Sequence, residues 1–237
     1  MAIFSHYVPI WVSALFLGAI LFPIFMIAGL AKKGVENPGK AQKVYFSIVG
    51  FYLCYLVYVS FASFSGWFEE ASLPPKILRL TMLPLLAFLL LVIFNLPIYT
   101  SILKQLSLSD LVGIHIFRLI GSFFLIMGFF QALPASISVI AGVGDIVTAV
   151  SSLFVASAIA KQKSYALKLT WLWNTFGLLD IFATSATAFI LTKLSIETGV
   201  QGVDALAAFP FCFIPAFAPA TIIFLHASVY RKLLSQK

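Results

Sequence analysis

Seven stretches of mostly apolar residues follow one another along the chain, and each is long enough to cross a lipid bilayer. A membrane-spanning helix needs about 20 such residues. The predicted spans are 7–30, 44–66, 77–99, 113–132, 135–160, 166–192 and 209–230. The connections between them are too short for a soluble domain, so residues 1–237 are expected to form one all-α bundle of seven transmembrane helices.

The composition supports this class. Hydrophobic residues make up 62% of the chain and charged residues 10%, and the mean hydropathy is +1.07. Soluble domains contain far more charge. No basic segment precedes the first apolar stretch, which is itself long enough to span, so it is expected to be retained as the first helix and not cleaved as a signal peptide.

Lysine and arginine are distributed unevenly between the two sets of connections. If the amino terminus is outside and the carboxyl terminus is cytoplasmic, eleven basic residues lie on the inner side: Lys32, Lys33, Lys40, Lys43, Lys104, Lys161, Lys163, Lys168, Arg231, Lys232 and Lys237. Three, Lys76, Arg79 and Lys193, lie outside, where the acidic residues Glu69, Glu70, Glu197 and Asp204 also fall. The positive-inside rule favours this orientation, so the net charge of +7 reflects membrane topology and not nucleic-acid binding.

Several residues inside the spans disturb an otherwise regular apolar pattern. Pro215 and Pro219 are one turn apart and are expected to kink the seventh helix, as a hinge or as static shape. Gly142 and Gly144 leave room for the close approach of a neighbouring helix or of a ligand. Cys54 and Cys212 are predicted to be small packing residues within helices two and seven.

Polar side chains recur at helical spacing in three consecutive spans. They are His115, Arg118 and Ser122 in the fourth; Ser138, Asp145, Thr148 and Ser152 in the fifth; and Trp173, Asp180, Thr184 and Thr187 in the sixth, with Asn174 on an adjacent face. Separations of three, four and seven residues place each set on one face of its helix. Charged and polar groups within a membrane usually face a bundle interior or a polar cavity.

The charged members of this set lie at similar depth. From a rise of 1.5 Å per residue, Asp180 is roughly 18 Å from Lys168, and Asp145 is roughly 16 Å from Pro134. Arg118 is roughly 12 Å from the inner edge and is expected to pair with one of the two carboxylates. The second carboxylate then becomes a candidate proton carrier, because burial favours its neutral form. The alternative is an ion pair that only determines helix packing.

Two histidines lie at matching depth, His115 in the fourth span and His226 in the seventh. Facing imidazoles suit a bis-histidine haem b, which is therefore kept as an alternative cofactor, although none is expected in the preferred interpretation. No ligand set for a metal ion is evident. The chain contains no HExxH or GxSxG pattern, so an enzyme is not indicated.

The back half of the chain resembles a family of bacterial inner-membrane proteins. The resemblance rests on Leu133-Pro134, on the segment from Ala141 to Asp145, on the segment from Trp173 to Asp180, and on Ile214-Pro215 through His226. It implies a bacterial, multi-pass protein of the inner membrane with seven helices, and it implies no reaction.

The preferred function is transport of a small solute or ion through a polar cavity formed by helices four to seven, either with or without coupling to protons. The residues expected along the pathway are Arg118, Asp145, Asp180, Asn174, His115, His226, Trp173, Thr148 and Thr184. The alternatives are a haem protein of electron transfer and a ligand sensor or assembly subunit that transports nothing. The expected partners are the lipid bilayer, the solute or ion, and either a second copy or another protein within the membrane.

Overall fold

The computed structural model describes residues 7–69 and 72–235, which form helices and contain no strand. The predicted topological roles of Glu70 and Lys237 lie outside the described residues. The helices are α1 (Ile10–Ala19), α2 (Leu21–Lys33), α3 (Pro38–Phe64), η1 (Leu78–Met82), α4 (Leu83–Ala87), η2 (Phe88–Val92), η3 (Ile93–Asn95), α5 (Pro97–Gln105), α6 (Leu108–Gly113), η4 (Ile114–Gly121), α7 (Ser122–Phe129), α8 (Ala135–Ala160), α9 (Ala166–Thr198), η5 (Asp204–Leu206) and α10 (Phe213–Leu234).

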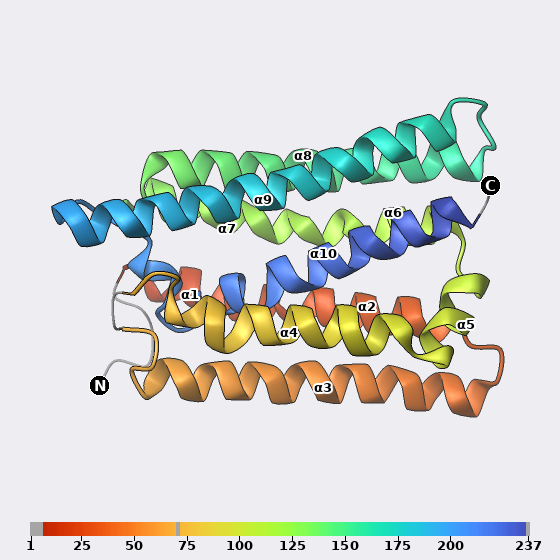
Figure 1. Cartoon of the computed structure of the whole chain (residues 1–237), viewed down its shortest axis with the longest axis horizontal. Helices are drawn as coiled ribbons and strands as arrows, with labels where there is room; N and C mark the ends of the chain where they lie inside the picture. Colours follow the sequence, from red (N-terminus) through yellow and green to blue (C-terminus); the bar gives the residue numbers. More distant parts are fainter. Residues whose placement is uncertain (1–6, 70–71, 236–237) are drawn as a thin grey trace.

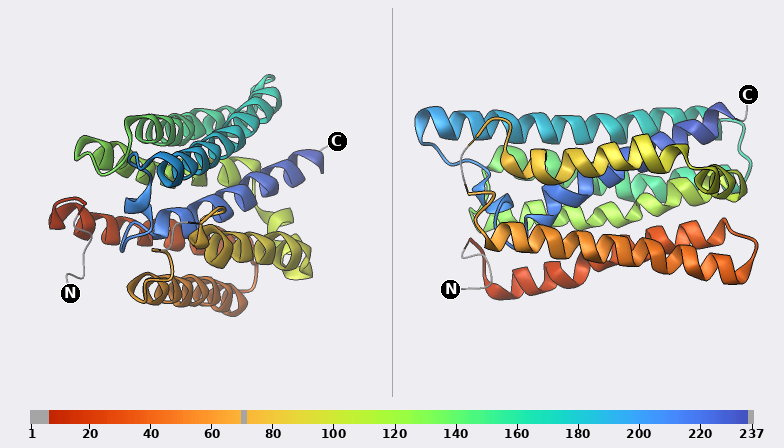
Figure 2. Two further views of the ribbon diagram at one scale, coloured as in Figure 1. Left: turned by 60° about the vertical axis from the view of Figure 1, so that its left-hand side comes forward. Right: turned by 60° about the horizontal axis from the view of Figure 1, so that its bottom comes forward.

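Seven helical stretches of the described chain are long and apolar enough to cross a membrane, as predicted. They are Ile10–Lys33, Pro38–Phe64, Leu78–Asn95, Leu108–Phe129, Ala135–Ala160, Ala166–Thr198 and Phe213–Leu234. Their ends lie within six residues of the predicted ends. The largest differences are at the start of α3 and at the end of α9, whose last turns project beyond the neighbouring helices (Figures 1 and 2).

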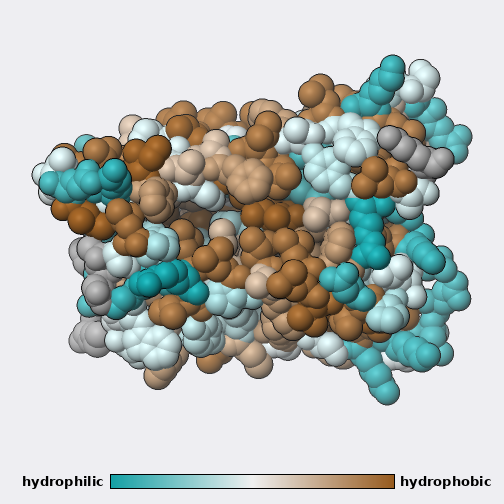
Figure 3. Space-filling model, viewed as in Figure 1, coloured by the Kyte–Doolittle hydropathy of each residue, from teal (hydrophilic) through white to brown (hydrophobic). Residues whose placement is uncertain are grey.

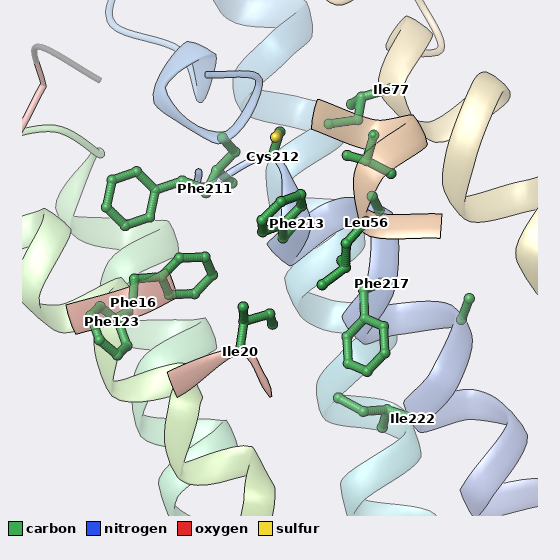
Figure 4. Close-up of a cluster of buried hydrophobic side chains, with 14 of the residues drawn as sticks. Phe16, Ile20, Leu56, Ile77, Phe123, Phe211, Cys212, Phe213, Phe217 and Ile222 are labelled. Atoms are coloured by element: carbon green, nitrogen blue, oxygen red, sulfur yellow. The ribbon is translucent and has the colours of Figure 1, made fainter. Parts of the chain in front are cut away.

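The spans run side by side with their axes roughly parallel, and α10 crosses between two groups of helices (Figure 1). The spans that contain α7, α8 and α9 lie on one side of α10, whereas α3 and α4 lie on the other. Aromatic and aliphatic side chains from α1, α7 and α10, among them Phe16, Phe123 and Phe217, form the core near one end of the bundle (Figure 4).

One helix was not predicted. A nine-residue amphipathic helix, α5, begins in the last three residues of the predicted third span and continues into the segment expected to connect it to the fourth. Side chains near the end of α10 hold it in place: Arg231 donates to the carbonyl of Phe94 at 2.5 Å and to the hydroxyl of Thr100 at 3.0 Å, and Lys232 donates to the carbonyls of Leu103 and Lys104. Helix α5 was not recognised from the sequence because the prediction rested on apolar stretches long enough to span a membrane, and α5 is too short.

Prolines interrupt three of the spans, but not all of them as expected. The first span breaks at Ile20, between α1 and α2, three residues before Pro23. The proline ring causes such a break because it displaces the backbone carbonyl four residues earlier. Pro84 likewise frees the carbonyl of Leu80, which accepts a hydrogen bond from the hydroxyl of Tyr58 at 3.0 Å. In the last span only Pro219 lies in the helix interior.

The expected role of Pro215 in a kink is therefore wrong. Because α10 begins at Phe213, Pro215 lies in its first turn, where backbone amides have no partner within the helix. The expectation for the two cysteines holds in part. Cys212 is buried, as expected of a packing residue, but occupies the N-cap position just before α10, and Cys54 lies in α3 but is exposed.

Charged residues of the described chain gather at the two ends of the bundle, as predicted from the loops. The lysine-rich end consists of the α2–α3 and α8–α9 connections, α5 and the end of α10; the opposite end consists of the α3–η1 and α9–α10 connections. An apolar band separates the two ends on the visible face, with most hydrophilic residues at the lysine-rich end (Figure 3). This is the surface of a helical membrane protein.

Candidate functional site

The fourth span changes its helical geometry at the residues predicted to matter most. Residues Ile114–Gly121 form a 3₁₀ helix, η4, between α6 and α7. Three residues per turn align side chains at positions i and i+3, so His115, Arg118 and Gly121 share one face. All three are buried. A 3₁₀ helix of eight residues is unusually long, and a 3₁₀ stretch within a longer helix often marks a functional hinge or local strain.

Arg118 is completely buried and binds groups from three other spans. Its Nε donates to Oδ1 of Asp145 on α8 at 2.7 Å, and its Nη2 donates to Oδ2 of Asp180 on α9 at 2.5 Å. Its Nη1 donates to the carbonyl oxygen of Gly177 at 3.0 Å and lies 3.1 Å from Nε2 of His226. The expected pairing with one aspartate is therefore corrected, because a planar guanidinium offers donors in several directions and reaches both.

Asn174 determines which ring nitrogen of His226 faces Arg118 and which one carries the proton. The side-chain amide of Asn174 donates to the backbone carbonyl of His226 at 3.1 Å, which turns its Oδ1 toward Nδ1 of the same imidazole at 2.8 Å. Oδ1 only accepts, so Nδ1 carries the proton and Nε2 presents a lone pair to Arg118. This neutral tautomer suits a cationic neighbour, because a second positive charge at Nε2 would face the guanidinium.

Glycines on three spans make room for the charged groups. A Cβ at Gly121 would overlap the carboxylate of Asp145, and a Cβ at Gly144 would overlap that of Asp180. A Cβ at Gly177 would lie 2.7 Å from the ring of His226. The gap predicted beside Gly144 is thus filled by a side chain of the protein, and Gly142 packs against Leu125. The helices approach closely here to enclose the charges.

We call Arg118, Asp145, Asp180, His226 and Asn174 the charge cluster. Its formal charges do not balance: one guanidinium lies between two carboxylates, and the imidazole and the amide are neutral. With both carboxylates ionised the cluster carries one negative charge. Buried charge without compensation is costly in a membrane, so one proton or one small cation would bring the cluster to neutrality.

A small cavity of about 40 Å³ adjoins the cluster on the side away from the lysine-rich end. Arg118, Asp145, Thr184 and Pro219 are among the residues that line it. This volume is large enough for a water molecule, which needs roughly 10–15 Å³ by the same kind of measure. It is far below the roughly 300 Å³ at which organic-ligand pockets begin.

Toward the lysine-rich end, the cluster is followed by a second imidazole. The rings of His115 and His226 have centroids 4.4 Å apart, and His115 also meets the edge of Trp173 at 5.0 Å. Neither ring nitrogen of His115 has a hydrogen-bond partner among the described residues, although the side chain is fully buried. Trp173 itself donates to the backbone carbonyl of Thr148 at 3.2 Å, and the Thr148 hydroxyl is unpartnered.

The structure therefore brings together most of the residues singled out in the sequence. Other members of the polar faces are bonded within their own helices: Ser138 to the carbonyl of Pro134, Ser152 to that of Ala149, and Thr187 to that of Ala183. Sequence reasoning missed Gly121, the carbonyl of Gly177 and the contribution of the first span, through Phe16 and Ile20, to the cavity. Gly121 could have been found from the sequence, because it follows Arg118 by three residues and can share its face of the helix.

The fold and the cluster define a multi-pass helical membrane protein with a buried ionic centre. The chain belongs to the family described as Domain of unknown function (DUF8737), whose model matches residues 75–234. The match runs from the third span to the seventh and includes the whole charge cluster. No curated protein and no solved structure matches the chain.

Proposed function

We propose that this protein moves protons, or another small monovalent cation, across the membrane through the charge cluster. The observation that carries the proposal is the excess of one carboxylate over guanidinium at the cluster. A proton bound to Asp145 or Asp180 neutralises the cluster, and its release restores the charge. Buried carboxylates that alternate in this way are typical of proton relays in pumps and transporters.

The size of the cavity narrows the expected cargo. Transport of a small solute or an ion was open on sequence grounds. The roughly 40 Å³ beside Arg118 and Asp145 admits water or a small ion, and an organic solute does not fit. The proposed path enters through this cavity, crosses the charge cluster and leaves past His226 and His115.

The proposed orientation of the path rests on the distribution of lysine. The positive-inside rule favours a cytoplasmic lysine-rich end, with the amino terminus and the cavity toward the outside. The protonatable cluster is then entered from outside and left through the imidazoles toward the cytoplasm. A bacterial inner membrane is the expected location, and a second copy or another protein within the bilayer is the expected partner.

Flux measured in liposomes tests the proposal. Purified full-length protein is reconstituted with a pH-sensitive dye inside, and proton entry is followed after a potential is imposed. We expect Asp145→Asn and Asp180→Asn each to abolish entry, because an amide cannot exchange a proton. Glu197→Gln is the matched control, since this exposed carboxylate lies 3.7 Å from Lys193 and outside the cluster.

The outcomes separate transport from a static role. Proton entry in the native protein that both aspartate variants retain would contradict the proposal. Entry absent from the native protein, with sodium and potassium flux also absent, would instead leave the cluster as a packing element, as in a sensor or assembly subunit. Gel filtration of each variant shows whether it is folded.

A bis-histidine haem remains the alternative function to be tested by spectroscopy. In the described arrangement the two imidazoles contact each other directly, and both nitrogens of His226 already face Arg118 and Asn174. Iron coordination would require these contacts to open. A visible spectrum of the purified protein before and after dithionite tests for haem. A band that shifts on reduction and is lost in His115→Ala would show that haem is bound and would contradict the transport proposal.

A further inference from the structure

A second, much larger cavity lies on the other side of α10 from the charge cluster. Its volume is about 590 Å³, within the range of organic-ligand pockets. Its walls come from α2, α3, η2, α5 and α10, and they are almost entirely apolar. We call it the lateral cavity. It takes no part in the function proposed above.

The shape of the lateral cavity follows α3. Seven residues of this helix line it, namely Lys40, Lys43, Val44, Ser47, Ile48, Phe51 and Tyr52. The spacing of three and four puts them on one face, and the distance from the first to the last is roughly 18 Å along the helix. The cavity is therefore a long slot that begins at the lysine-rich end and extends toward the middle of the membrane.

The charged groups in the walls are concentrated at one end. Lys40 and Lys43 stand at the rim, and neither has an ion-pair partner among the described residues. No acidic residue of the described chain lines the cavity. Deeper in the slot, Tyr99 donates to Ser228 at 2.6 Å, and the hydroxyls of Tyr52 and Thr221 are 3.2 Å apart, so these groups already satisfy each other.

One side of the slot faces lipid. Phe51 on α3 and Phe88 on η2 stack at 5.2 Å between ring centroids, and both are more than a third exposed. Other large apolar side chains on α3 and on the third span are also exposed, and a bilayer would cover them. A chain that is anchored in the bilayer can enter sideways without crossing the protein.

We infer that the lateral cavity binds an anionic phospholipid. One acyl chain lies in the apolar slot, and the phosphate is held between Lys40 and Lys43. Both lysines stand at the start of a membrane-spanning helix, which is the level at which phosphates of a bilayer lie. The inner hydroxyls are already paired, so the chain in the slot is held by apolar contact.

Native mass spectrometry of the full chain in a neutral detergent tests this inference. The probes are dioleoyl phosphatidylglycerol, which is anionic, and dioleoyl phosphatidylcholine, which carries the same chains and no net charge. We expect one bound phosphatidylglycerol and a clear preference for it over phosphatidylcholine. Equal binding of the two lipids by the native protein would overturn the inference.

Two variants separate the head group from the chain. Lys40→Gln with Lys43→Gln is expected to weaken phosphatidylglycerol binding by roughly 30-fold, since each lysine near a membrane surface contributes to anion binding. Lys161→Gln with Lys163→Gln removes the same charge at the same end, away from the cavity, and is expected to change binding little. A preference that survives the first pair overturns the inference.

Filling the slot tests the position of the acyl chain. Val44→Trp places an indole in the cavity and is expected to lower the binding of both lipids. Val57→Trp is the matched control, because Val57 is on the same helix, is 69% exposed and does not line the cavity. Unchanged binding in Val44→Trp would contradict the inference, and Asp145→Asn should leave lipid binding intact whatever its effect on proton flux.

Discussion

The charge cluster and the lateral cavity lie on opposite sides of α10, and the helices pack closely around the first but leave a space at the second. On one side the charge cluster is closed: four of its hydrogen bonds converge on Arg118, and glycines bring the helices together around it. On the other side the lateral cavity leaves about 590 Å³ between helices whose walls are apolar. Buried charge needs close partners, whereas apolar walls tolerate a space that lipid can fill.

The difference also concerns how each region is built along the chain. Every member of the charge cluster comes from the matched residues 75–234 of the family. The lateral cavity, in contrast, takes one wall from α3 and part of another from α2, which precede that match. The cluster is thus built entirely from the helices that the family model covers, and the cavity depends on how the first two spans pack against them.

The largest effect is expected when the guanidinium of Arg118 is removed from the charge cluster. Arg118→Met leaves Asp145 and Asp180 buried without a partner, which is expected to lower the free energy of unfolding by about 3–5 kcal/mol. Thermal unfolding in detergent, followed by gel filtration, measures the loss. Adding Asp145→Asn and Asp180→Asn to Arg118→Met should recover most of it, and failure of this triple variant to recover stability would show that packing of the guanidinium matters more than charge.

The close approach of the helices is tested by adding one methyl group. Gly144→Ala and Gly121→Ala each place a Cβ on an aspartate carboxylate and should destabilise the protein by about 1–3 kcal/mol. Gly50→Ala is the control, because a Cβ there meets nothing within 4 Å. Its effect should be neutral or slightly stabilising, since alanine favours a helix more than glycine does. Equal unfolding temperatures for all three variants would contradict the closed arrangement.

The lateral cavity depends on α5, which forms part of its wall at the lysine-rich end. Arg231→Gln loses donors to the carbonyl of Phe94 and to Thr100, at an expected cost of about 1 kcal/mol. Most of this change should be local, so hydrogen exchange of amides in Pro97–Gln105 is the measurement. Faster exchange throughout α10 as well would mean that the tether stabilises the bundle and not only α5.

The smallest effect on the free energy of unfolding is expected for an exposed ion pair, with which the loss at the buried Arg118 can be compared. Lys33 and Asp110 are 2.6 Å apart, but the Lys33 side chain is 64% exposed. Solvent screens such a pair, so Lys33→Gln should cost less than about 1 kcal/mol, and added salt should reduce the difference further. A loss comparable to that of Arg118→Met would remove the distinction between buried and exposed charge on which the comparison rests.

The positions of the spans were predictable because hydrophobic length is a local property. Seven apolar stretches and their approximate ends follow from the requirement of about 20 residues to cross a bilayer. The shared faces of His115 and Arg118, and of Asp145 and Thr148, follow from helical spacing in the same way. The amphipathic α5 was missed, since nine residues between two long spans resemble a connection.

The partners of Arg118 were only partly predictable. Depth along three helices indicated that both aspartates were within reach, but depth does not give the rotation of one helix against another. That rotation places Asp145 and Asp180 on either side of one guanidinium and turns the lone pair of His226 toward it. It also directs Gly121 and Gly144 at the carboxylates, which no spacing within a single helix reveals.

By itself the sequence determined a helical membrane protein with seven spans, an uneven distribution of lysine, and charged residues near the middle of three spans. These follow from the cost of exposing polar groups to lipid, which acts residue by residue. The tertiary structure alone decided that one arginine serves two carboxylates and that a long apolar cavity lies behind α10. Both depend on contacts between residues distant in the chain, where packing selects one arrangement among many that the same hydrophobic pattern allows.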